Sequence, residues 1–269
     1  MSSSRQGNDR KSGQNRGPGR RSGGGGGRGF SPSGELIWGW HAAVAALANP
    51  ERGSPHHLWV TPERAKALAE RFSPKLRGEI LDNHAIAQKL PPGAVHQGIA
   101  LDIAAPPGVD IRDLARPAQG IILMLDQVTD PQNVGAILRS AAAFGAKGVV
   151  MQDRHAPALA GALAKAAAGA ADALPVCHAT NLSRALEALS DAGWRAVGLA
   201  GEAEHDLDDV LDGGPTVLVL GSEGEGIRRL VAEHCDVLAR IPMPGGFESL
   251  NVSAAAAVAL YAASRRVKP

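Results

Sequence analysis

Residues 121–151, IILMLDQVTDPQNVGAILRSAAAFGAKGVVM, place two short apolar runs on either side of a segment with helical spacing. In the runs at 121–125 and 148–151, polar residues do not alternate with apolar ones. Strands without this alternation are typical of a sheet that is covered on both faces. The stretch therefore predicts a strand–helix–strand unit of a parallel α/β sheet, with its helix over residues 134–144.

The same alternation of short apolar runs and segments with helical spacing continues to the end of the chain. Four more apolar runs predict strands at 174–177, 195–200, 216–220 and 237–241. Helical periods predict helices near 158–169, 181–192, 225–234 and 250–264. Because ligands of parallel sheets bind beyond the carboxyl ends of the strands, we expect a site in the loops after residues 126, 200, 220 and 241.

A smaller α+β unit is predicted before this sheet, over residues 35–105. Its expected parts are a helix that Pro50 ends, a strand at 56–60, a helix over 61–72 and a strand within 96–104. A proline-rich stretch follows and is interpreted as a linker over 106–120. The larger domain then covers 121–269.

The charges divide the chain into a basic tail and an acidic remainder. Residues 1–34 carry seven Arg or Lys residues against the single Asp9, a net charge of +6, and the remaining 21 basic and 26 acidic residues sum to −5. This Gly/Arg-rich tail has almost no apolar residues, so it is predicted to be disordered. It serves either as a sequence-tolerant RNA contact or as a solubilising extension.

Composition excludes several classes of site. Cys177 and Cys235 lie far apart and lack the spacing of metal ligands, so no metal site and no disulfide framework is expected, and the cytoplasm is the predicted compartment. No apolar run reaches the roughly 18 residues of a membrane span, and no signal peptide is expected. The glycines at 221, 224 and 226 do not form the dinucleotide pattern, and no lysine completes a P-loop.

Three loop–helix segments remain as candidates for the functional site: DPQNVGAILRSAAAFG at 130–145, LVLGSEGEGI at 218–227 and IPMPGGFESLNVSAAAAVALY at 241–261. In this order they resemble the three motifs of the SpoU (TrmH-like) RNA 2′-O-ribose methyltransferases. The segments WGWHAAVAAL and AVHQGIAL resemble the family's small RNA-binding domain. The resemblance is greatest to the branch that methylates a guanosine of 23S ribosomal RNA.

The resemblance implies a trefoil knot in the larger domain and S-adenosylmethionine bound among the knotted loops, largely by backbone groups. It also implies a homodimer that acts on ribosomal RNA. The cofactor contacts that it implies are Gly201, Leu220, Gly221, Ile241 and Leu250.

Methyl transfer requires the ribose hydroxyl to be aligned with the methyl group and relieved of its proton. The resemblance puts five side chains around that point: Asn133, Arg139, Glu223, Ser249 and Asn251. Arg139 is either the general base or, because a guanidinium stays protonated, an RNA clamp that stabilises the developing alkoxide.

Each of these residues also has a purely structural interpretation. Asn133 could cap its helix, Glu223 could be a turn residue, and Ser249 and Asn251 could cap the last helix. His96 and Gln97 of the smaller unit contact RNA or form a strand-end pair. A non-catalytic RNA-binding assembly factor and a tRNA methyltransferase are the alternative functions, and the resemblance of the small domain to the ribosomal branch disfavours the latter.

Overall fold

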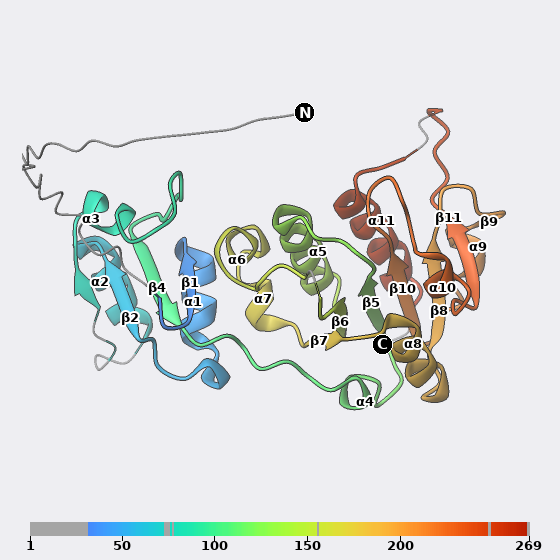
Figure 1. Ribbon diagram of the computed structural model, residues 1–269, viewed down its shortest axis with the longest axis horizontal. Helices are drawn as coiled ribbons and strands as arrows, with labels where there is room; N and C mark the ends of the chain where they lie inside the picture. The colour runs from blue at the N-terminus through green and yellow to red at the C-terminus, as the bar shows by residue number, and fades with distance from the viewer. Residues whose placement is uncertain (1–31, 73–75, 77, 155, 247–248, 268–269) are drawn as a thin grey trace, which may run out of the picture. The chain divides into compact units, whose positions relative to one another are not determined.

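Two β-sheets organise the described part of the chain in the computed structural model (Figure 1). The structure describes residues 32–72, 76, 78–154, 156–246 and 249–267. Nearly all of the tail predicted to be disordered, residues 1–31 of 1–34, lies outside these residues. Phe247 and Glu248 of the third motif lie outside them too.

The smaller sheet has four strands in the order β1-β4-β2-β3. Its strands are β1 (Glu35–Trp38), β2 (His57–Val60), β3 (Glu79–Ile80) and β4 (Ile99–Ile103). β4 is antiparallel to β1 and β2, while β3 is parallel to β2. The accompanying helices are α1 (Trp40–Ala48), η1 (Pro50–Arg52), α2 (Pro62–Arg71) and α3 (Asn83–Ala87).

The larger sheet has seven strands in the order β7-β6-β5-β10-β8-β11-β9, and every neighbouring pair is parallel. Its strands are β5 (Ile121–Leu125), β6 (Gly148–Gln152), β7 (Val176–Ala179), β8 (Arg195–Leu199), β9 (His205–Asp206), β10 (Thr216–Leu220) and β11 (Val237–Arg240). The predicted parallel α/β sheet is thus confirmed. Because β10 lies between β5 and β8, the chain changes direction across the sheet at this point, where such folds bind ligands.

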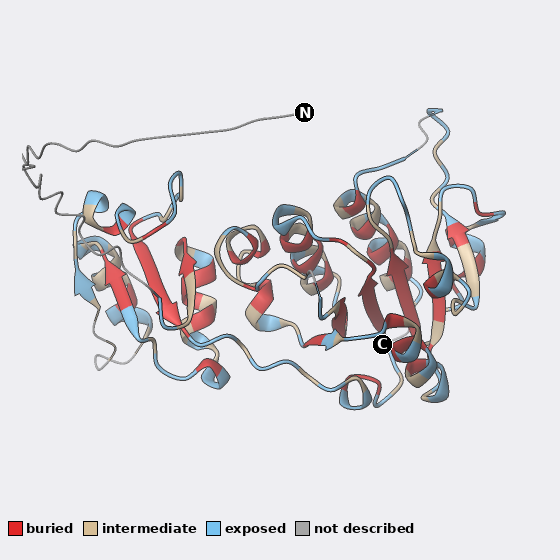
Figure 2. Cartoon of the chain, viewed as in Figure 1, coloured by how far each residue is buried: buried red, intermediate tan, exposed pale blue. Residues whose placement is uncertain are grey.

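Helices cover both faces of this sheet, as the absence of in–out alternation predicted. Along β5, Leu123 packs in one core with α5 (Pro131–Ala143), α6 (Gly161–Ala167) and α11 (Val252–Ser264). Its neighbour Met124 packs in the opposite core with α4 (Ile111–Leu114) and α8 (Leu182–Asp191). Figure 2 shows the resulting buried central strands. Three shorter helices complete the domain: α7 (Ala170–Ala173), α9 (Leu207–Val210) and α10 (Arg229–Ala232).

Small residues bring the helices of one face close to their neighbours. In α5, a Cβ on Gly135 would lie 2.6 Å from the Ala166 side chain of α6, so only glycine permits this approach. In α11, Ala256, Ala259 and Ala263 are buried against the sheet and α5. The alanine run therefore allows close packing, and it holds the start of α11 at the carboxyl edge of the strands.

The structure corrects one predicted helix and adds elements that were not predicted. The helix expected over 225–234 begins only at Arg229, because Gly226 has a φ of +67° and Arg228 has a non-helical ψ of 142°. The two-residue strand β9 and the short helices α7 and α9 were not predicted. Within the predicted linker, α4 forms and buries Leu114.

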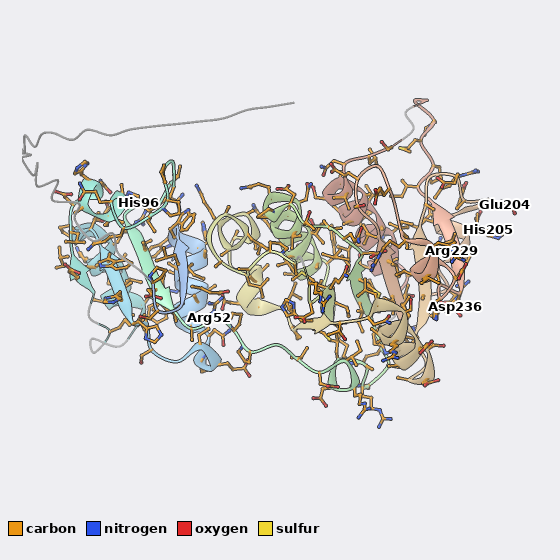
Figure 3. The ribbon with its side chains drawn as sticks, viewed as in Figure 1. Arg52, His96, Glu204, His205, Arg229 and Asp236 are labelled. Carbon is orange, nitrogen blue, oxygen red and sulfur yellow. The ribbon has the colours of Figure 1, made fainter. Side chains whose placement is uncertain are left out.

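A buried arginine connects the smaller sheet's unit to α7 within residues 31–269, which form one compact unit. The Arg52 side chain is fully buried, and its Nε lies 2.5 Å from Asp172 of α7. Its Nη1 lies 3.3 Å from Glu35 of β1, and burial raises the pKa of that carboxyl although the guanidinium opposes the shift. Figure 3 labels Arg52. Breaking such a buried pair leaves an uncompensated charge, so the contact is expected to be sensitive to substitution.

Two predictions concern features that strand order does not test. The trefoil knot describes how the chain threads through its own loops, and it stays a prediction. The domain boundaries after residues 34, 105 and 120 also stay predictions, although the two sheets fall on either side of the predicted linker. Among the described residues, no helix is long and apolar enough to cross a membrane, and no group of three potential metal ligands gathers.

Candidate active site

A cavity of about 630 Å³ opens beyond the carboxyl ends of β8, β10 and β11. The residues that line it are 199–202, 220–224, 226, 239–241, 243, 249–252 and 255. They include all five residues expected to contact the cofactor: Gly201, Leu220, Gly221, Ile241 and Leu250. Three of the loops predicted to form the site therefore meet at one cavity.

The loop after β10 can form one wall of this cavity only because Gly221 has no side chain. A Cβ on Gly221 would lie 1.9 Å from the carbonyl carbon of Gly226, far inside any allowed contact. Ser222 and Gly226 form an isolated antiparallel bridge, and Gly224 and Gly226 have φ values of +89° and +67°. Glycine adopts such values without steric cost. The loop consequently turns back on itself and presents peptide groups to the cavity.

A buried carboxylate fixes the far end of this loop. Asp126, directly after β5, is fully buried and accepts hydrogen bonds from the backbone N–H of Arg228 at 2.9 Å and from its Nε at 2.8 Å. The Nη2 of Arg228 also lies 2.7 Å from Asp126. Neither residue was predicted as part of the site, although Asp126 was visible as the polar residue that ends a buried strand. Their pairing spans 102 positions, so no local pattern indicated it.

Asn133, Glu223 and Asn251, three of the predicted catalytic residues, meet in one hydrogen-bonded cluster. The Nδ2 groups of Asn133 and Asn251 donate to Glu223 Oε1 at 3.3 and 2.6 Å. Asn251 Nδ2 also lies 3.1 Å from Asn133 Oδ1, and the Val252 N–H donates to Glu223 Oε1 at 3.3 Å. Each residue comes from a different motif, and Glu223 and Asn251 line the cavity.

The structure shows which of these residues cap helices. Asp130, not Asn133, caps α5, since its side chain accepts hydrogen bonds from the N–H groups of Gln132 and Asn133. Asn251 does cap α11, through Ser253, while its Nδ2 belongs to the cluster. Asn251 therefore has both roles.

The remaining two predicted residues lie outside the cluster. Ser249 is exposed and lines the cavity two positions before the cap of α11. Arg139 is exposed on α5, about 9 Å along the helix axis from Asn133. Within the described residues, its guanidinium forms no ion pair and does not line the cavity. The cavity also includes Glu202 and Met243, which were not predicted but follow β8 and β11 directly.

Comparison with known proteins identifies a family that matches this chain. The sequence profile of the SpoU rRNA Methylase family matches residues 120–261, which is more than half of the chain. The chain belongs to this family. The 23S rRNA (guanosine-2′-O-)-methyltransferase RlmB of Pseudomonas aeruginosa is 39% identical over 256 residues, covering 87% of this chain and 98% of that protein. The protein of the same name from Photobacterium profundum is 40% identical over 247 residues, covering 87% and 98%.

Solved structures of RNA methyltransferases have a similar fold. A structure described as an RNA 2′-O ribose methyltransferase is 26% identical with a TM-score of 0.71, covering 86% of this chain and 88% of that one. An AdoMet-bound rRNA methyltransferase of Sinorhizobium meliloti has a TM-score of 0.74 at 24% identity, covering 87% and 88%, and supports the fold alone. The predicted SpoU membership is confirmed.

Proposed function

We propose that this SpoU protein transfers the methyl group of S-adenosylmethionine to the ribose 2′-oxygen of a guanosine in 23S ribosomal RNA. The observation that carries the proposal is the meeting of Asn133, Glu223 and Asn251 at a cavity formed by three strand ends. The RlmB relatives, matched over nearly their whole length, support the substrate.

The cavity suits the proposed donor. Its volume of about 630 Å³ is typical of a cofactor site, and its walls combine apolar side chains with peptide groups. Leu220 and Ile241 offer apolar surface, and Gly201 and Gly221 leave peptide groups uncovered by side chains. Bound there, S-adenosylmethionine supplies an electrophilic methyl group on a sulfonium sulfur.

The clustered side chains have distinct roles in this proposal. Glu223 holds the amides of Asn133 and Asn251 in fixed orientations, so that the ribose is positioned before the reaction. As the ribose oxygen bonds to the methyl carbon, the carbon–sulfur bond of the donor breaks and a neutral thioether leaves. The hydroxyl proton must leave as well, and Glu223 is the only one of the three able to accept it. A guanidinium is a hydrogen-bond donor without acceptor capacity, so we assign Arg139 to an RNA phosphate or to the developing alkoxide.

A gene deletion tests this function. Ribose methylations of ribosomal RNA are mapped in the deletion strain and after complementation. One guanosine of 23S rRNA is expected to lose its 2′-O-methyl group and to regain it with the wild-type protein but not with Asn133→Ala. Gln132→Ala, an exposed neighbour in the same helical turn, is the matched control and should restore methylation. An unchanged methylation map in the deletion strain would refute the proposal.

We further propose that the protein is a homodimer through the exposed face of α11. Val258 and Tyr261 on this helix are 43% and 55% exposed, and Tyr261 lies edge-to-face with Phe144 at 5.9 Å. Large apolar side chains gathered on a surface indicate an interface. Val258→Glu should convert a sedimenting dimer to a monomer, whereas Val95→Glu, at a comparably exposed site in the smaller unit, should not. A monomeric wild-type protein would exclude this interface.

A further inference from the structure

A second cavity, of about 660 Å³, lies beyond the carboxyl ends of β6 and β7. Arg184 at the start of α8 and Arg228, Arg229 and His234 around α10 line it, and we call it the arginine cavity. Figure 3 labels Arg229 beside α10. Among the described residues that line it, Glu187 is the only carboxylate. Asp126 and Glu233 pair with two of these arginines, so the cavity offers an anionic ligand the guanidinium of Arg184, unpaired within the described ranges, and the exposed donors of the other two.

Arg228 is held in place before any ligand arrives. Asp126 binds both the Nε and the Nη2 of its guanidinium, and Gln152 Oε1 lies 3.4 Å from Nη2. The side chain nevertheless stays 40% exposed, while Asp126 is fully buried. A guanidinium fixed in this way loses little conformational freedom on binding, and its Nη1 group, which neither Asp126 nor Gln152 contacts, can donate to a phosphate oxygen.

The neighbouring arginines are more accessible. The Arg229 side chain is 80% exposed and lies 2.6 Å from Glu233, a surface pair on α10. Arg184 is exposed, and within the described residues its guanidinium has no ion-pair partner. Surface pairs of the Arg229–Glu233 kind are weak, so Arg229 can exchange its partner for a ligand at little cost.

The arginine cavity adjoins the donor cavity through one loop. Residues 220–226 line the donor cavity, and residues 228–231 of the same connection line the arginine cavity. Both lie at the carboxyl edge of the sheet, and their nearest strands, β6 and β10, are two strand spacings apart, about 10 Å. A short segment of a nucleic acid backbone can span this length, whereas a small isolated anion cannot occupy both cavities.

We propose that the arginine cavity binds successive backbone phosphates of the substrate RNA, close to the nucleotide whose ribose is methylated. This inference rests on the proposed function, because it takes RNA as the substrate. It assigns Arg184, Arg228 and Arg229 to backbone contacts, which fix the register of the RNA on the sheet edge and carry no sequence information.

The test compares RNA affinity across salt concentrations for the full chain. The probe is a fluorescein-labelled single-stranded RNA oligonucleotide, titrated between about 50 and 200 mM salt. Arg184→Ala with Arg229→Ala should weaken binding about tenfold and reduce the slope of log affinity against log salt by about 1.4, since each phosphate contact in single-stranded RNA contributes about 0.7. Donor affinity, measured by calorimetry, should be unchanged because neither residue lines the donor cavity.

Arg112→Ala is the matched control. Arg112 is an exposed arginine on α4, which precedes β5 and therefore lies toward the amino ends of the strands. Its replacement should leave the slope as in the wild type. A double variant with the wild-type slope and affinity would overturn the phosphate assignment, whether or not the protein methylates RNA. Absence of methyl transfer by the wild type would instead refute the proposed function, and the salt slopes would still report on the arginine cavity.

Discussion

Replacing Gly221 by alanine tests whether the folded-back loop after β10 forms the donor cavity. The added Cβ would lie 1.9 Å from the Gly226 carbonyl carbon, 2.1 Å from its oxygen and 2.2 Å from the Ile227 nitrogen. All three are backbone atoms, so no side-chain rotation can relieve the clash. Since carbon atoms pack at about 3.5–4.0 Å, the two sides of the loop must separate by about 2 Å.

This separation sets the size of the expected effect. Forcing an extra methyl group into a closely packed site costs about 1–3 kcal/mol. If the loop relieves the strain by opening, that energy is lost from binding of S-adenosylmethionine. Because about 1.4 kcal/mol corresponds to tenfold in affinity, Gly221→Ala should weaken donor binding by about 5- to 150-fold.

Isothermal titration calorimetry measures the donor affinity, and circular dichroism shows whether the variant is folded. Gly108→Ala is the matched control, since its added Cβ would meet no atom closer than 3.6 Å and lies away from the cavity. It should bind the donor like the wild type. A folded Gly221→Ala protein with wild-type donor affinity would refute the assignment of this loop to the cavity.

Three further predictions follow from individual groups. Glu223→Gln should lower kcat about 100- to 10,000-fold, because the amide cannot accept the hydroxyl proton. Tm should change little, because the side chain is exposed; steady-state kinetics and thermal unfolding check both. Burial raises the pKa of Cys177 to about 11 and that of Cys235 to about 12, so neither thiol should react with a disulfide reagent at pH 8 until the protein is unfolded, and rapid reaction of the native protein would be inconsistent with this. The hydrogen bond from the His234 ring to a backbone carbonyl of α10, aided by Glu187, raises the pKa of His234 above 6.5. The stability that its protonation contributes is therefore complete below about pH 6.5 and is lost as the pH rises through the folded-state pKa. An NMR titration should show the raised pKa, and Glu187→Gln should lower it.

The parallel sheet was predictable because its signal is local. Each of the strands β5, β6, β8, β10 and β11 is an apolar run that begins where the sequence indicated. β7 begins two residues later than expected, at Val176 rather than 174, because Leu174 completes the turn after α7. β9 pairs only through two residues and leaves no periodic signal.

The sequence could predict the site only as far as its motifs indicate which residues lie close together in space. Asn133, Glu223 and Asn251 meet as the resemblance implied, although they are 90 and 28 positions apart along the chain. Helix capping could not be assigned in advance, because Asp130 and Asn133 are both good capping residues and only the backbone decides between them.

The Asp126–Arg228 pair could not be predicted by the same means. A buried carboxylate and its arginine 102 residues away share no periodicity, and their contact exists only once β5 and β10 are neighbours. The prediction of a helix over 225–234 made this pair harder to foresee, because it put Arg228 inside a helix, whereas Arg228 lies in the loop before α10. Pairs of this kind depend on tertiary structure, and here the pair connects the donor loop to the arginine cavity.

The most direct test of the account is the chemical position of the transferred methyl group. Purified protein is incubated with S-adenosylmethionine labelled in its methyl group and with deproteinised 23S rRNA from a strain that lacks the gene, and the RNA is then hydrolysed in alkali. A methylated ribose cannot cleave its own phosphodiester, so the account predicts label in an alkali-stable dinucleotide that contains 2′-O-methylguanosine. Label in ordinary mononucleotides, or no label at all, would contradict it.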